Sequence, residues 1–212
     1  MLGTYDAEPF PRLVISLARE ASIPTFLLAH GAYLMPETLL DMESGDAVAV
    51  YSEAVAVPGM RRDRPVHVVG YPLLYREPDR RARANPPRVV VLGQNGHPYT
   101  SRFDERLVPR HYRVALAALR ASLPGAEIVL RPHPSQDLGP IRATLADFAP
   151  ARTEIDASSP LDGLLASADL CIGSLSTATL QAALQGTEVV VLNVTGFTWT
   201  WPLGGDTPVP IG

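Results

Sequence analysis

Residues 170–186 read LCIGSLSTATLQAALQG, and this stretch indicates how the C-terminal part of the chain folds. Residues 170–173 form a short apolar run, as in a strand that is buried on both faces of a sheet. The hydroxyl-rich residues that follow open a compact helical pattern over residues 176–185, and Gly186 is placed to end that helix. The stretch therefore predicts a strand followed directly by a helix.

The same alternation extends through the second half of the chain. Apolar runs predict strands at residues 88–92, 127–130 and 188–193, with a weaker one at 153–156. A helical pattern between the first two has five apolar residues on one face: Tyr112, Ala115, Leu116, Leu119 and Leu123. Strands that alternate with helices predict an α/β fold, a Rossmann-like parallel sheet with helices on both faces.

The first part of the chain shows a shorter version of this pattern. Residues 12–21 predict a helix, and three apolar runs predict parallel strands buried on both faces, at residues 23–29, 47–51 and 66–69. A complete Rossmann-like domain normally holds five or six strands, so residues 1–72 predict a partial domain. Residues 73–87, rich in Arg, Pro and Asp, predict a linker, and residues 88–212 a second domain.

Composition excludes several classes of protein. The 212 residues are 46% hydrophobic and 19% charged, the balance of a globular protein. A net charge of −4 gives no reason to expect a nucleic-acid partner. The single Cys171 is expected to be a small buried side chain, which fits a reducing cytoplasm. No apolar run approaches the roughly 20 residues of a membrane span, and residues 1–11 lack the pattern of a signal peptide.

Polar residues that could carry chemistry cluster where the predicted strands end. Ligands collect at the carboxyl ends of parallel strands, because the loops there lead into helix N-termini. Four groups of residues follow such ends: His30 with Gly31; Gln94 with Asn95; Arg131 with His133; and Ser174 with Ser176 and Thr177.

Two of these groups together predict a phosphate cradle. Hydroxyls beside the free N–H groups of a helix start favour an anion, although Ser174 or Ser176 could instead simply cap the helix. In the other group, Pro132 and Pro134 stiffen a loop that presents Arg131 and His133, so a cation and an imidazole can meet a phosphate with little loss of entropy. We expect these loops to emerge at the same edge of the sheet.

The remaining histidines give weaker signals. His30 could be a general base, a donor to phosphate or a hydrogen-bonded turn residue. His97 lies in a polar loop, and His111 is expected on the solvent face of its helix. The spacing of His30, His97 and His133 does not match a zinc site, so no metal site is predicted, although a divalent ion bridging a nucleotide diphosphate stays open. The absence of GxGxxG, GxxxxGK[ST] and GxSxG argues against dinucleotide oxidoreductases, P-loop enzymes and serine hydrolases.

The order of these motifs resembles the GT-B transferases of bacterial capsule and teichoic acid synthesis. The relatives are the CDP-glycerol glycerophosphotransferases, the capsule-type sialic acid and Kdo transferases and, more distantly, the UDP-N-acetylglucosamine 2-epimerase fold. The matching stretches are residues 23–31, 46–53, 69–72, 131–134 and 174–177. The short first domain departs from the family, which leads us to expect a fragment of a longer protein.

The resemblance implies two facing Rossmann-like domains, the second of which holds a nucleotide-activated donor. Arg131 and His133 would then contact donor phosphate, and His30 and His133 are the catalytic candidates. The other residues assigned to donor binding are Gln94, Asn95, Ser174, Ser176 and Thr177. No metal and no cofactor is expected, since the donor is a substrate.

The function implied is transfer of a sugar or polyol phosphate from a nucleotide sugar or nucleotide-polyol donor to a saccharide or lipid-linked acceptor. Such an enzyme would work in the cytoplasm, at the inner face of the membrane, as a peripheral protein. Two alternatives stay open: a UDP-sugar 2-epimerase-like enzyme, and a non-catalytic nucleotide-binding remnant. The remnant would be completed by a partner chain or by a missing N-terminal half.

Overall fold

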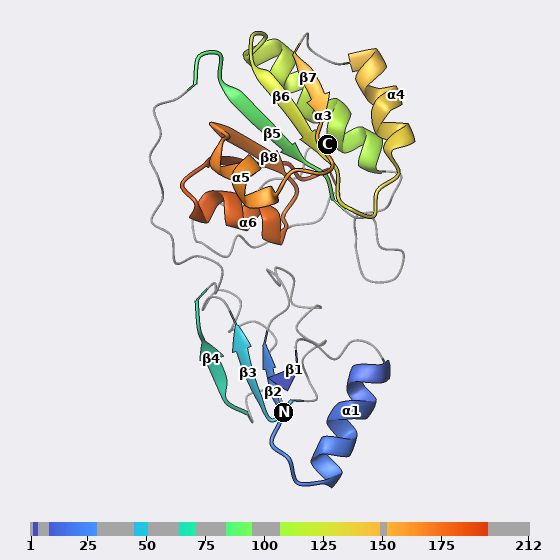
Figure 1. Ribbon diagram of the computed structural model, residues 1–212, viewed down its shortest axis with the longest axis vertical. Helices are drawn as coiled ribbons and strands as arrows, with labels where there is room; N and C mark the ends of the chain where they lie inside the picture. Colours follow the sequence, from blue (N-terminus) through green and yellow to red (C-terminus); the bar gives the residue numbers. More distant parts are fainter. Residues whose placement is uncertain are drawn as a thin grey trace. The chain divides into compact units, whose positions relative to one another are not determined.

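The chain divides into two compact units, one made of residues 1–75 and 199–207 and the other of residues 76–198 and 208–212. The computed structural model describes residues 2–3, 9–28, 45–50, 64–70, 84–94, 107–148 and 152–194. Each unit contains its own parallel β-sheet (Figure 1). Most of the predicted linker, residues 73–87, lies outside the described residues, so the predicted domain bounds stay predictions.

The N-terminal unit has a four-stranded parallel sheet in the order β1-β2-β3-β4. Its helix α1, Pro9–Glu20, confirms the predicted helix. Three strands confirm the predicted runs, and they are β2 (Phe26–Leu28), β3 (Ala47–Val50) and β4 (Val66–Val68). The expectation of three strands was nevertheless wrong by one, because Leu2–Gly3 forms β1 beside β2. Two residues are too few to produce a periodic signal in the sequence.

Burial within this sheet depends on the position of each strand. In the third strand, Val48, Ala49 and Val50 are completely buried. The prediction of burial on both faces is wrong for β4, where His67 and Val68 are exposed. This strand has a neighbour on one side only in the described sheet, so half of its surroundings are open.

The C-terminal unit has a five-stranded parallel sheet in the order β7-β6-β5-β8-β9. All five predicted strands are confirmed, with these bounds: β5 (Arg88–Leu92), β6 (Glu127–Arg131), β7 (Thr153–Ile155), β8 (Leu170–Gly173) and β9 (Glu188–Val191). Four helices accompany them: α3 (Leu107–Ser122), α4 (Leu138–Phe148), α5 (Leu161–Ala166) and α6 (Thr177–Leu184). The sequence had predicted α3 and α6, and the left-handed backbone of Gly186, with φ 84°, ends α6 as expected.

Helices cover both faces of this sheet, as predicted. Alternate residues of β5 point to opposite faces, so Val89 and Val91 pack with α3 and α4, whereas Val90 and Leu92 pack with α5 and α6. Figure 1 shows these helices around the sheet. This two-sided burial explains the uninterrupted apolar run of the strand. Each fully buried valine contributes about 1.5–3 kcal/mol of hydrophobic stabilisation.

Two further expectations have an outcome in this unit. Cys171 is buried, and burial raises the pKa of its thiol to about 12, in keeping with a small core side chain. None of the described helices is long and apolar enough to cross a membrane.

Candidate functional site

Two predicted site residues meet at the centre of the C-terminal sheet. The chain runs outward from β5 through β6 to β7 and then continues on the other side of β5 with β8 and β9. Loops that leave β5 and β8 therefore diverge, and such switch points are where open α/β sheets bind ligands. Gln94 follows β5 and Ser174 follows β8, and the Ser174 hydroxyl donates a hydrogen bond of 2.8 Å to Oε1 of Gln94.

The loop after β6 presents His133 at the same edge of the sheet. Ser135 holds the ring through its hydroxyl, at 2.8 Å from Nδ1, and through its backbone N–H, at 3.2 Å. Because a backbone N–H can only donate, Nδ1 accepts, and the proton of the neutral ring is on Nε2. Partial burial lowers the pKa of His133 below its usual value. At neutral pH the side chain therefore offers an N–H donor from Nε2.

Gln136 is a residue of this edge that sequence reasoning missed. Its Oε1 accepts from the backbone N–H of His133 at 2.8 Å and from the Tyr112 hydroxyl at 3.2 Å. Its Nε2 donates to the carbonyl oxygen of Gln94 at 2.8 Å. The signal available in the sequence was an amide side chain within the turn that follows the proline-stiffened loop.

Gly93 is also part of this arrangement. A Cβ atom at this position would overlap Oε1 of Gln136 and the hydroxyl of Tyr112, and would lie 3.0 Å from the backbone nitrogen of His133. Glycine leaves room for this close approach, and a larger residue would displace these side chains; no unusual backbone angle is involved. The signal available was a glycine directly after an apolar strand.

Arg131 is engaged by a neighbouring strand. Its Nη1 donates to the carbonyl oxygen of Asp156 at 3.1 Å and lies 3.5 Å from Oδ1 of the same residue. Both side chains are largely buried, with exposed fractions of 15% and 18%. Hydrogen bonds from Ser159 and Ser158, with the nearby guanidinium, lower the pKa of Asp156. The pair therefore ties the end of β6 to the loop after β7, and phosphate binding by Arg131 stays a prediction.

Ser176 caps helix α6. Its hydroxyl accepts from the backbone N–H of Thr179 at 3.2 Å, and the Thr179 hydroxyl donates to the carbonyl oxygen of Ser174 at 2.7 Å. Of the two alternatives for this serine, capping is thus the role that the structure displays. Thr177, the first residue of α6, is half-buried at the same helix start. Ligand binding by Ser176 and Thr177 stays a prediction.

Several other predicted residues are distributed differently. His30, Asn95 and His97 lie outside the described residues, so their roles stay predictions.

His111 was expected on a solvent face, and this prediction was wrong. The side chain is completely buried, and its Nε2 lies 2.9 Å from the carbonyl oxygen of Leu92. The helix packs so closely on β5 that His111 and Tyr112 both face the core. Burial lowers the pKa of His111 to about 4.

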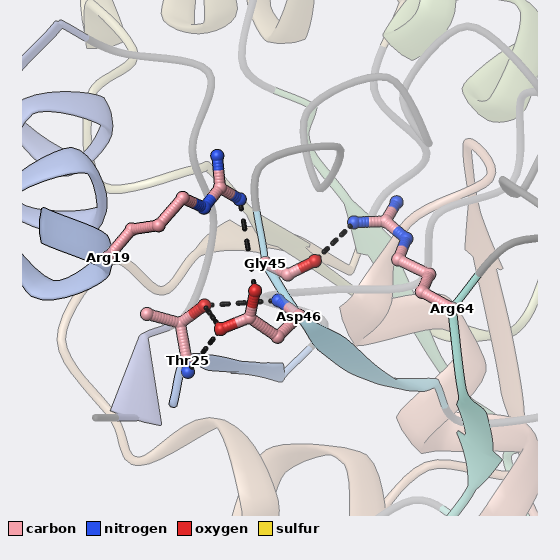
Figure 2. A network of polar contacts seen from close by, with 5 residues as sticks. All are labelled: Arg19, Thr25, Gly45, Asp46 and Arg64. Carbon is pink, nitrogen blue, oxygen red and sulfur yellow. Dashed lines mark hydrogen bonds and ion pairs between the residues drawn. The ribbon is translucent and has the colours of Figure 1, made fainter. Parts of the chain in front are cut away.

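The N-terminal unit has a polar network at the amino ends of its strands, whereas the candidate site of the C-terminal unit lies at the carboxyl ends. Thr25 and Asp46 immediately precede β2 and β3, and one carboxylate oxygen of Asp46 accepts from the backbone N–H and the hydroxyl of Thr25 at 2.8 and 2.7 Å (Figure 2). Arg19 lies 3.9 Å from the other oxygen, and Arg64 donates to the carbonyl oxygen of Gly45 at 3.1 Å. These contacts join the amino ends of adjacent strands and so stabilise the sheet.

The C-terminal unit also has an open cavity of about 430 Å³ at the amino ends of its strands. Its lining comes from β5, β6 and β7, with Arg88, Glu127 and Arg152 among the residues. None of the predicted site residues lines it, since those residues follow the carboxyl ends. Among the described residues, no group of three or more His, Cys, Asp or Glu side chains could hold a metal ion.

These features define a class of structure: α/β units with parallel sheets, in which polar residues lie at the topological switch point of the C-terminal sheet. The sequence matches no protein-family model and no curated protein sequence. Solved structures with a similar fold do exist. The pneumococcal O-GlcNAc transferase GtfA, in complex with UDP and GlcNAc, is similar over 85% of this chain with a TM-score of 0.57 at 9% identity.

Two further structures extend the comparison. MurG of Acinetobacter baumannii is similar over 86% of the chain with a TM-score of 0.52 at 18% identity. TarM of S. aureus, crystallised with alpha-GlcNAc-glycerol and UDP, is similar over 80% with a TM-score of 0.51 at 10% identity. The chain spans 39%, 48% and 37% of the GtfA, MurG and TarM chains, respectively. The predicted α/β fold with parallel sheets is confirmed, and it is similar to the fold of these three structures.

Proposed function

We propose that this chain is part of a glycosyltransferase that uses a nucleotide-activated donor. The donor phosphate would lie at the carboxyl edge of the C-terminal sheet, next to Gln94, His133 and Ser174. The observation that carries the proposal is the hydrogen bond between Gln94 and Ser174 at the switch point of the sheet, with the His133 loop clamped beside it. The presence of UDP in the GtfA and TarM structures supports a nucleotide diphosphate as the ligand.

The chemistry of such a site is electrostatic. A transferase must stabilise the negative charge that grows on the leaving nucleotide phosphate, and one well-placed hydrogen-bond donor is worth about 10²–10³ in rate. In this proposal the Nε2–H of His133 supplies such a donor, and the N-terminus of α6 adds its positive dipole end. His30 would serve as a base or a second phosphate ligand. The proposal includes neither a metal nor a cofactor.

The finer proposal concerns the pathway. The order of the five motifs in the sequence supports a transferase of bacterial surface-polysaccharide assembly, which moves a sugar or polyol phosphate to a saccharide or lipid-linked acceptor. An acceptor of that kind would bring the protein to the inner face of the membrane.

Calorimetric titration of the chain with CMP, CDP, UDP and GDP tests the donor site. We expect one nucleotide to bind, and we expect His133→Ala to weaken that binding about tenfold or more, the effect of losing a hydrogen bond to a charged group. His67→Ala is the matched control, since it removes an exposed histidine from β4. If no nucleotide binds, or if His133→Ala binds as well as the wild type, the donor site is wrong.

The type of reaction can be tested with the sugar nucleotide that corresponds to the best-bound base. Consumption that requires an added acceptor supports a transferase. Conversion of the sugar nucleotide alone would support the epimerase alternative instead.

A further inference from the structure

The backbone ladder between β5 and β6 ends just before the loops of the donor site. Its last bond joins the N–H of Gly93 to the carbonyl oxygen of Arg131 at 2.7 Å. Beyond this point, the backbone groups of Gln94 and His133 are bridged by the side chain of Gln136. A carboxamide carries one acceptor and one donor group, as a peptide unit does, and it therefore continues the ladder by one step.

We propose that Gln136 is a positioning residue of the donor site, which holds the backbone of Gln94 and of His133 in the arrangement that a donor phosphate requires. This inference rests on the donor site proposed above. Gln136 would not itself contact the phosphate. It acts on two residues at once, each of which follows one of two adjacent strands, β5 and β6.

The geometry shows why both ends of the carboxamide are needed. Oε1 and Nε2 each form a 2.8 Å bond, one to the N–H of His133 and the other to the carbonyl oxygen of Gln94. Leucine has neither group. Asparagine is shorter by one methylene, and a glutamate carboxylate has no N–H for the Gln94 carbonyl.

The orientation of the carboxamide is fixed by its partners. The backbone N–H of His133 can only donate and the carbonyl oxygen of Gln94 can only accept, so these two groups set the orientation. The Tyr112 hydroxyl donates to Oε1 of Gln136 and adds to it, and burial raises the pKa of Tyr112, so the phenol keeps the proton that it donates. Oε1 therefore faces His133 and Tyr112, and Nε2 faces Gln94. The absence of a side chain at Gly93 leaves room for this contact.

The consequences extend to both ligand-facing groups. The side chain of Gln94, whose backbone is held by Gln136, receives the hydrogen bond of Ser174. The backbone N–H of His133 is held by Gln136, and the ring of His133 is oriented by Ser135 two residues further on. Loss of the carboxamide would therefore loosen the donors on both sides of the switch point.

The test compares Gln136→Leu with the wild-type full chain in two measurements. The first is the affinity for the best-binding nucleotide of the four, and the second is hydrogen exchange at the backbone amide of His133. We expect about tenfold weaker binding, because both bonds of the carboxamide are lost, and about 2-fold to 10-fold faster exchange at His133, because its amide loses one hydrogen bond. Gln136→Met, of similar length, replaces the leucine variant if that variant does not fold.

Thr144→Val is the control for a loss of stability without a change at the site. It removes a buried hydroxyl that donates to the carbonyl oxygen of Pro140 within α4. We expect this variant to bind nucleotide within about twofold of the wild type, a difference of less than 0.5 kcal/mol.

The outcomes separate this inference from the proposed function. A folded Gln136 variant that binds nucleotide as the wild type does, or that keeps the slow exchange of His133, overturns the positioning role. A wild-type chain that binds none of the four nucleotides overturns the donor site, and with it the claim that Gln136 positions residues for a donor phosphate. In that case, exchange at His133 still decides whether Gln136 holds the backbone of His133.

Discussion

Replacing Gly93 by alanine probes the close approach at the centre of the proposed site. The new methyl group would overlap Oε1 of Gln136 and the hydroxyl of Tyr112. Gln136 must then move away, and its hydrogen bonds to His133 and to Gln94 are lost or lengthened. The backbone angle at Gly93 is accessible to alanine, so any effect comes from this overlap.

The expected magnitude follows from three contributions. Insertion of a methyl group into a packed site destabilises by about 1–3 kcal/mol. A buried Tyr112 hydroxyl left without its acceptor adds about 1–3 kcal/mol. The lower entropy of the unfolded alanine chain offsets about 0.4–1 kcal/mol. These ranges combine to about 1–6 kcal/mol, and we expect the free energy of unfolding of the C-terminal unit to fall by a value in the middle of that range, about 2–4 kcal/mol.

Native-state hydrogen exchange of the β5 amides measures this change without assuming that the two units unfold together. The slowest amides should exchange roughly 30-fold to 1,000-fold faster in Gly93→Ala. Gly125→Ala is the matched control, because a Cβ at Gly125 meets nothing within 4 Å, and we expect it to stay within about 0.5 kcal/mol of the wild type. If Gly93→Ala also stays within that range, the packing described here around Gln136 is wrong.

Three other predictions concern stability. The pKa of His111 is about 4 in the folded state and 6.5 in the unfolded state, so the unfolded state binds more protons between these pH values. The contribution of His111 to the free energy of unfolding is therefore complete above pH 6.5. It falls by up to about 3 kcal/mol as the pH is lowered towards 4. Urea unfolding at pH 7 and 4.5 should show this loss in the wild type, and a His111→Gln variant with an equal loss would contradict it. Asp46→Ala removes the acceptor of the buried Thr25 and should lower the free energy of unfolding of the N-terminal unit by about 1–3 kcal/mol in urea unfolding. Arg19→Ala breaks an exposed 3.9 Å ion pair and should change this free energy by less than about 0.5 kcal/mol. Equal effects of the two variants would refute this ranking. Ser176→Ala should lower the unfolding free energy of the C-terminal unit by about 1 kcal/mol through loss of the α6 cap, and an unchanged hydrogen-exchange profile of α6 would show that the cap is dispensable.

Local sequence patterns determined the order and type of most elements. The run at residues 88–92 specifies β5 because its four apolar residues, 89–92, suit a strand buried on both faces. Gly186 ends α6 because glycine readily adopts the left-handed angle found there. These signals depend on neighbours within a few residues. The two-residue strand β1 gave no such signal, because it is defined by its pairing with β2, which lies more than 20 residues away in the chain.

The sequence also located the edge at which the candidate site residues lie, since polar residues followed several apolar strands. Gln94 and Ser174 were both predicted, and their contact joins positions 80 residues apart. The hydrogen bond between these two side chains forms because β5 and β8 are neighbours in the sheet. No single motif in the sequence predicts that order of strands.

Only the tertiary structure decided how these residues are used. Arg131 faces Asp156, 25 residues away, and Gln136 reaches Tyr112 and Gln94 at separations of 24 and 42 residues. His111 is buried because α3 lies close to β5, and the periodicity of the helix does not predict how close the helix lies to the strand. The sequence by itself thus determined the elements and the edge where polar loops gather, because both arise from local periodicity and turn chemistry. The partners of each polar group were decided by the packing of strands and helices that are distant in the chain, because a hydrogen bond depends on the final distance between two atoms and not on the residue type alone.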